Sequence, residues 1–132
     1  MQQTLCALLI AVTNMATQTS SPSNWVGVWQ GELDGIPSVV LTLGEDGGTL
    51  QGTIVLNGIN HDGGTPHIAV REAHVLLLPS VRGTTLSFEV KRVQGSSAKM
   101  DFTVEQTSNA SANLHCLNCG NDAPIVEMTK QD

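Results

Sequence analysis

Alternation of apolar and polar residues with a period of two is the feature that most constrains the fold of this chain. Beyond residue 24 the alternation recurs in short runs, and none of them shows the 3.6-residue period of an amphipathic helix. Met100, Phe102 and Val104, for example, alternate with three polar residues, which is typical of a strand with one buried face. The sequence therefore predicts an all-β protein.

Eight segments carry this strand pattern and are separated by turn residues. They are residues 25–33, 38–43, 50–56, 72–78, 86–91, 100–105, 112–116 and 125–130. The run Asp46-Gly47-Gly48 is the clearest hairpin turn, because glycine adopts the positive φ that tight hairpins require. Further turns are expected at residues 34–37, 79–83 and 94–97, and the longest loop at 57–67. Successive hairpins favour an antiparallel up-and-down eight-stranded β-barrel, in which closure removes the exposed strand edges.

The N-terminal region differs from the rest of the chain. Residues 5–12 form an uncharged apolar run, which is too short to span a bilayer and typical of a secretory signal. We expect residues 1–16 to be a signal peptide, residues 17–24 a polar linker and residues 25–132 a single barrel domain, secreted or periplasmic. The alternative is that the apolar run is a buried first strand.

Composition limits the classes of partner. The 132 residues carry a formal net charge of −6, and the six Lys and Arg residues are scattered. Without a basic patch the chain has no means of neutralising phosphates, so nucleic acid is not an expected partner. The sequence also suggests no cofactor.

Two cysteines remain once the proposed signal containing Cys6 is removed. They are Cys116 and Cys119, and an even number in an exported protein predicts a disulfide. The segment lacks the βαβ context of a redox motif, and His115 alone is too little to complete a zinc site.

The sequence has a tryptophan near the start of the first predicted strand and a lysine near the end of the last, and the two side chains are expected to be in contact. Trp29 is expected on the inward face, with Gly27 beside it, and Lys130 shares a face with Val126 and Met128. The first and last strands of a closed barrel are neighbours. The Lys130 ammonium is therefore predicted to lie over the Trp29 ring and help to close the barrel.

The Gly27-Val28-Trp29 opening and the basic residue ending the last strand resemble the calycin group, which comprises lipocalins, fatty-acid-binding proteins and avidin-like barrels. The chain is also similar to uncharacterised exported domains of soil bacteria. The resemblance implies a small barrel that encloses an apolar ligand.

The inward-facing residues expected to line such a space are medium-sized and apolar. They are Leu41, Leu43, Ile54, Leu56, Val75, Leu77, Phe88, Val90, Met100, Phe102, Val104 and Met128. An eight-stranded barrel is just wide enough either to be filled by side chains or to hold one small molecule. We expect binding of a small hydrophobic molecule, entering opposite Trp29, and keep open a ligand-free structural or partner-binding domain with a solid core.

Two further possibilities rest on single segments. His61, Asp62, His67 and His74 could bind metal or transfer protons, but no catalytic or metal motif surrounds them, and loops often carry His and Asp for turn reasons. We therefore predict neither an enzyme nor a metal site.

Strand 72–78 is apolar on both faces, so outward-pointing Leu76 and Leu78 would favour self-association.

Overall fold

The computed structural model of the protein describes residues 22–91 and 99–132. Apart from one turn of 3₁₀ helix, η3 (Pro22–Trp25), the regular elements in these two ranges are β-strands. The all-β prediction is therefore confirmed. The expected signal peptide (residues 1–16), the greater part of the linker and the turn at 94–97 lie outside the described residues.

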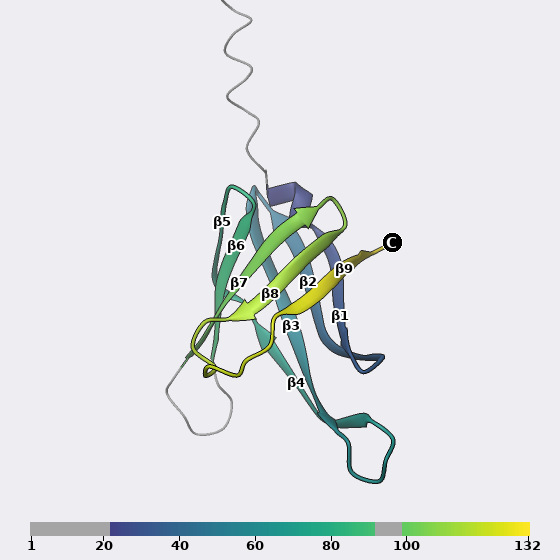
Figure 1. Ribbon diagram of the computed structural model, residues 1–132. Coiled ribbons are helices and arrows are strands. Elements are labelled where there is room, and N and C mark those ends of the chain that lie inside the picture. The colour runs from purple at the N-terminus through teal and green to yellow at the C-terminus, as the bar shows by residue number, and fades with distance from the viewer. Residues whose placement is uncertain (1–21, 92–98) are drawn as a thin grey trace, which may run out of the picture.

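The strands follow one another as antiparallel hairpins in a single sheet (Figure 1). In chain order they are β1 (Gly27–Leu33), β2 (Ile36–Asp46), β3 (Thr49–Asn60), β4 (His67–Val75), β5 (Leu77–Arg82), β6 (Thr85–Lys91), β7 (Lys99–Ser108), β8 (Ser111–Cys116) and β9 (Val126–Gln131). The order across the sheet is β4-β3-β2-β1-β9-β8-β7-β6-β5. The first and last strands are thus neighbours, as predicted.

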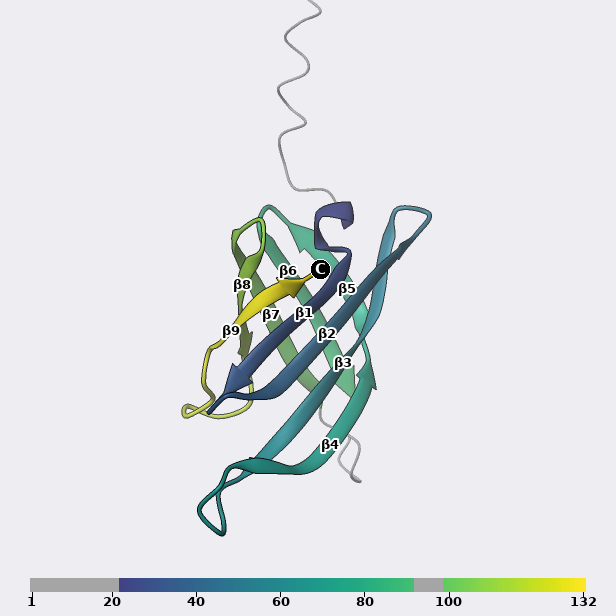
Figure 2. The ribbon, with the colours of Figure 1, turned by 90° about the vertical axis from the view of Figure 1, so that its right-hand side faces the viewer.

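The sheet curls around its own apolar face. In Figure 2 strands β1 to β4 lie in front and β6 to β8 behind, with η3 across one end and the β3–β4 hairpin extending beyond the other. We call these the tryptophan end and the distal end. The predicted tight hairpin joins β2 to β3, where Asp46 pairs with Thr49 and both Gly47 and Gly48 have positive φ.

Nine strands are present in the described residues, where eight were expected, because β4 ends at Val75 and a separate strand, β5, begins at Leu77 and takes up most of the turn expected at 79–83. β4 pairs with β3 and β5 pairs with β6, so one continuous stretch of chain supplies both edge strands of the sheet. Leu78 adopts a φ of 50°, and the β5–β6 register shifts between Leu77 and Ser80. The chain therefore bends where the pattern predicted a straight strand.

The register of this segment also differs from the prediction. Val75 was expected to face inward, and this was wrong: it is 66% exposed, and Leu76 is buried instead. Leu77 was also expected to face inward, and this was wrong: it is half-buried and pairs with Glu89, which alternates with inward-facing Phe88 and Val90. The outward position expected for Leu78 is confirmed, whereas the one expected for Leu76 was wrong. Positions 72, 74 and 76 can face inward because His74 lies within hydrogen-bond distance of Glu72, which is itself half-exposed. Neither polar side chain is therefore buried without a partner.

The first strand begins two residues later than expected. Residues 22–25 form η3 rather than linker and strand, and β1 begins at Gly27. Trp25 is fully buried, so it belongs to the core and η3 covers the tryptophan end. Leu33, at the end of β1, is 39% exposed and does not belong to the core, although alternation from inward-facing Trp29 predicts an inward position for it.

Candidate functional site

Two indoles close the tryptophan end. Trp25 and Trp29 are both fully buried, with ring centroids 5.6 Å apart and planes inclined by 43°. Trp29 Nε1 donates a hydrogen bond to the Trp25 carbonyl oxygen at 3.0 Å, which ties η3 to β1. Trp25 Nε1 is buried and has no hydrogen-bond partner among the described residues. This end of the sheet is filled by aromatic side chains.

Lys130 completes this closure from the last strand. The predicted contact is confirmed: Lys130 Nζ lies 5.6 Å from the Trp29 ring centroid, and the two residues are register partners across β1 and β9. Lys130 Nζ also donates to the Asn24 carbonyl oxygen at 3.3 Å. A Cβ on Gly27 would lie 2.9 Å from Lys130 Cε, so the missing side chain makes room for the lysine stem.

Gly31 permits a second close approach beside Trp29. A Cβ there would collide with Val126 and lie 3.2 Å from Met128 Cγ. The space beside the ring is therefore occupied by side chains of β9.

Most of the predicted lining residues face the core, but they differ in burial. Leu41, Leu43, Ile54, Phe88, Val90, Phe102, Val104 and Met128 are buried, whereas Leu56 and Met100 are only half-buried. The rings of Phe88 and Phe102 stack at a centroid distance of 5.3 Å. Half-buried Leu56 and Met100 pair in register with buried Val39 and Val90, so burial differs between neighbouring strands.

The distal end holds a polar pair that sequence reasoning did not place there. His74 pairs in register with fully buried Ile54, and Glu72 pairs with Leu56, so both side chains lie on the inward face. His74 is 7% exposed, and its Nε2 lies 3.4 Å from Glu72 Oε1. The alternation of Glu72, His74 and Leu76 was the available signal. It was masked by the greater hydrophobicity of Val75 and Leu77.

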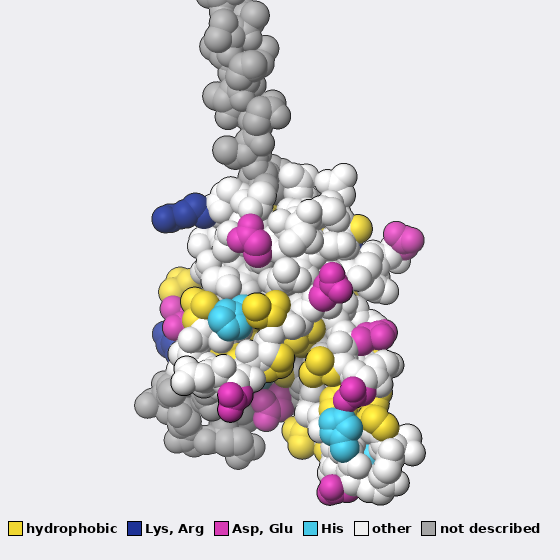
Figure 3. Space-filling view, viewed as in Figure 1, with side chains coloured by type: hydrophobic (Ala, Val, Ile, Leu, Met, Phe, Trp, Pro, Cys, Tyr) yellow, Lys and Arg dark blue, Asp and Glu magenta, His cyan; other side chains and the backbone are white. Residues whose placement is uncertain are grey.

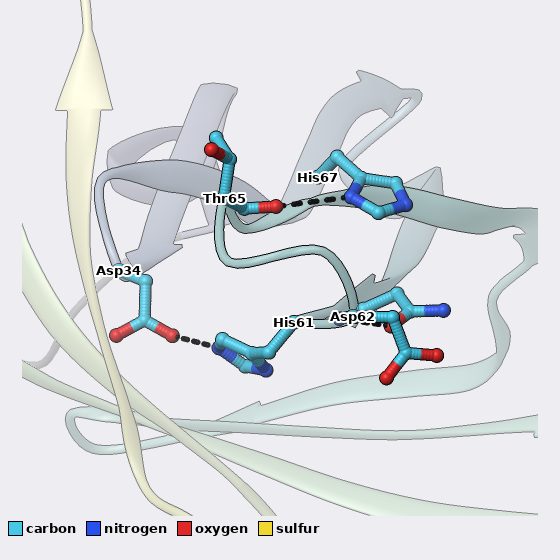
Figure 4. Close-up of polar contacts among 6 residues, drawn as sticks. Asp34, His61, Asp62, Thr65 and His67 are labelled. Atoms are coloured by element: carbon cyan, nitrogen blue, oxygen red, sulfur yellow. Dashed lines mark hydrogen bonds and ion pairs between the residues drawn. The ribbon is translucent and has the colours of Figure 1, made fainter.

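The remaining residues considered as metal ligands, His61, Asp62 and His67, do not converge on a common site. In Figure 4 His61 points toward Asp34, and its Nε2 lies 2.5 Å from Asp34 Oδ2. His67 turns away, with Nδ1 3.1 Å from the Thr65 carbonyl oxygen. The Asp62 backbone N–H binds Asn60 Oδ1 at 2.7 Å, which is a local turn contact. Within the described ranges, no three His, Cys, Asp or Glu side chains are placed to hold a metal ion.

The predicted disulfide is confirmed. Cys116 ends β8 and is joined to Cys119 with a Cα–Cα distance of 5.5 Å. Asn118 inside this small ring accepts a hydrogen bond from the Asp101 backbone N–H and donates one to the Lys99 carbonyl oxygen. The ring therefore fastens the turn after β8 to the start of β7.

One carboxylate on the outer face has a shifted pKa. Thr84 and Thr85 donate hydroxyl hydrogen bonds of 2.5 and 2.6 Å to Glu105. These bonds stabilise the charged form and lower the pKa of Glu105. The contact joins β7 to the start of β6.

Comparisons with protein-family models, with curated proteins and with solved structures found no match to this chain. Among the residues that the structure describes, no helix has the length and hydropathy needed to cross a lipid bilayer. The class defined by the observed geometry is a curled, all-antiparallel sheet whose first and last strands pair.

Proposed function

We propose that this protein is an exported, calycin-like barrel that binds one small, mainly apolar molecule at its distal end. The observation that carries the proposal is a pair of partly exposed apolar side chains on the inward face. Leu56 and Met100 are half-buried, although their register partners Val39 and Val90 are buried. In Figure 3 hydrophobic side chains also gather toward the distal part of the face shown. Partly exposed apolar residues on a concave face are the usual lining of a small-molecule site.

Closure of the barrel is part of this proposal. β4 and β5 act as two halves of one bent strand, which makes the sheet equivalent to a closed eight-stranded barrel. In support, the Leu76 backbone N–H donates to the Gly52 carbonyl oxygen at 3.0 Å, and β4 contacts β6 as well as its register partner β3. A bend that lets one strand serve both edges would leave no long unpaired edge.

The ligand enters from the distal end, because Trp25 and Trp29 obstruct the other. His74 and Glu72 supply the polar contact in an otherwise apolar lining, and one hydroxyl or amide on the ligand would satisfy them. The ligand class is therefore an apolar molecule with one polar group. Export depends on the apolar run at residues 5–12 and is tested by N-terminal sequencing of the protein recovered from the medium or periplasm.

Fluorescence titration with the neutral apolar probe N-phenyl-1-naphthylamine tests the binding. Wild-type protein should give a saturable enhancement, and Leu56→Phe should weaken it by about tenfold by filling the distal space. Val75→Phe adds the same kind of ring to the outer face and should bind like wild type. Met100→Phe provides a second filling variant if Leu56→Phe does not fold. A wild-type protein without saturable enhancement would contradict the proposal.

A second candidate function is a solid-cored interaction module that self-associates through segment 72–78. Exposed Val75 and Leu78 favour it, because they lie on the two edge strands of the sheet. Light scattering at increasing protein concentration should show a dimer that Val75→Lys disrupts and that Ile125→Lys, at another exposed apolar position, leaves intact. A monomer at all concentrations would exclude it.

A further inference from the structure

A polar hollow lies at the tryptophan end, away from the proposed apolar site. Its volume is about 450 Å³, within the range of small-molecule sites. The lining combines η3, the β5–β6 turn, the end of β7 with its following turn, and β9. The lining residues are Asn24, Thr84, Gln106, Thr107, Ser108, Asn109 and Lys130.

Lys130 is the only charged residue of this lining. Its Nζ is held by the Asn24 carbonyl oxygen and by the face of Trp29, so the ammonium has a fixed position. An ammonium has three N–H donors, and the bond to Asn24 uses one of them. No carboxylate in the described ranges forms an ion pair with Lys130. The hollow thus contains an ordered cation with donor capacity left over.

The lining of the hollow contains no acidic residue. Glu105, which precedes Gln106 in the chain, follows inward-facing Val104 and lies on the outer face of β7. Both of its oxygens already accept hydrogen bonds, from Thr84 and Thr85. The hollow itself offers amides and hydroxyls from the side chains of Asn24, Gln106, Ser108 and Asn109.

We propose that this hollow is a second binding site, which takes a small hydroxylated carboxylate. The carboxylate would accept charge-assisted hydrogen bonds from Lys130, while the ligand hydroxyls would bind the amides of Gln106 and Asn109. A volume of about 450 Å³ exceeds that of a bare inorganic anion and suits a molecule of sugar-acid size. This site is independent of the apolar ligand proposed for the distal end.

The two tryptophans provide the measurement. They are the only Trp residues in the chain, which has no tyrosine, and the Trp29 ring lies beneath Lys130. Binding of an anion at Lys130 should therefore change the intrinsic emission. Sodium gluconate is the probe, with glucose as the neutral analogue and sodium chloride as the control for ionic strength. Gluconate should give a saturable change that neither control reproduces.

Asn109→Asp tests the site without removing the contact between Lys130 and Trp29. It places a negative charge in the hollow and should weaken gluconate binding by about tenfold, corresponding to the loss of one charge-assisted contact. Gln30→Glu adds the same charge on β1, outside this hollow, and should leave the affinity unchanged. Gln106→Glu is a second variant with the same expectation as Asn109→Asp.

Three results would overturn the proposal: an absent or unsaturable response to gluconate, an equal response to glucose, or equal affinities for wild type and both acidic variants. Leu56→Phe should leave gluconate binding unchanged. A failure of the apolar site can therefore be distinguished from a failure of this one.

Discussion

Lys130, the next-to-last residue of β9, lies with its ammonium 5.6 Å from the centre of the Trp29 ring in β1 and is its register partner. This contact joins residues 101 positions apart (130 − 29) and connects the two ends of the chain's β-structure. The Asn24 carbonyl oxygen holds the same ammonium, so η3, β1 and β9 are fastened at one point.

Lys130→Ala should lower the free energy of unfolding by about 1 kcal/mol, because it removes a half-buried cation–π contact. Lys130→Arg keeps a cation over the ring and should retain most of the stability. Arg82→Ala removes an exposed cation at the end of β5 and serves as the control, with little expected change. Urea unfolding followed by tryptophan fluorescence measures all three. Equal losses for Lys130→Ala and Arg82→Ala would show that the ring contact contributes nothing specific.

Gly31→Ala should destabilise the protein by about 1–3 kcal/mol, because the new methyl group overlaps Val126 and crowds Met128. Gly44→Ala is the matched substitution, since a Cβ there meets no atom within 4 Å and the backbone φ is ordinary. It should be neutral or slightly stabilising. The comparison uses thermal and urea unfolding, and equal midpoints for the two variants would contradict the close packing of β1 against β9.

Glu105 should contribute a pH-dependent part of the stability. Its pKa is lowered in the folded protein by Thr84 and Thr85, so the stabilisation is present above the pKa of the unfolded chain and is lost as the pH falls through the folded value. The Thr84→Val/Thr85→Val double variant should raise the pKa of Glu105 and flatten the acid dependence of unfolding. NMR titration of the Glu105 carboxyl carbon reports the pKa. Thr53→Val, on the outer face of β3, should leave that titration unchanged, and an unchanged curve in the double variant would refute the assignment.

Reduction of the Cys116–Cys119 disulfide should lower stability only modestly. The closed ring spans four residues, which in the chain-entropy account corresponds to at most about 2 kcal/mol. Unfolding with and without reductant, with alkylation to verify the thiols, measures the effect. The reduced protein should remain folded at room temperature. Complete unfolding on reduction would mean that the turn after β8 has a larger role than its contacts suggest.

Much of the sheet was predictable from the sequence, because period-two alternation and glycine turns are local features. The hairpin at Gly47 and Gly48 and the pairing of Trp29 with Lys130 follow directly from them. The second relation was accessible because the first and last strands of a meander that closes on itself are neighbours.

The course of segment 72–78 could not be read in the same way. Its run of apolar residues is compatible with either face inward, and the choice depends on whether His74 and Glu72 find partners inside. The bend at Leu78 accompanies the register shift of β5 against β6, and the capping by Trp25 involves contacts of η3 with β2 and β3, which local patterns do not encode. The polar hollow was missed for the same reason, since its lining comes from four separate parts of the chain.

The pairing of β1 with β9 has a consequence for handling the protein. β1 starts where β9 finishes, as the pairing of Val28 with Gln131 records, so both described chain ends emerge beside η3 (Figure 1). A tag, surface tether or fused partner at the C-terminus would leave from that side. Immobilisation through the C-terminus would orient the distal end, where the apolar site is proposed, toward solution.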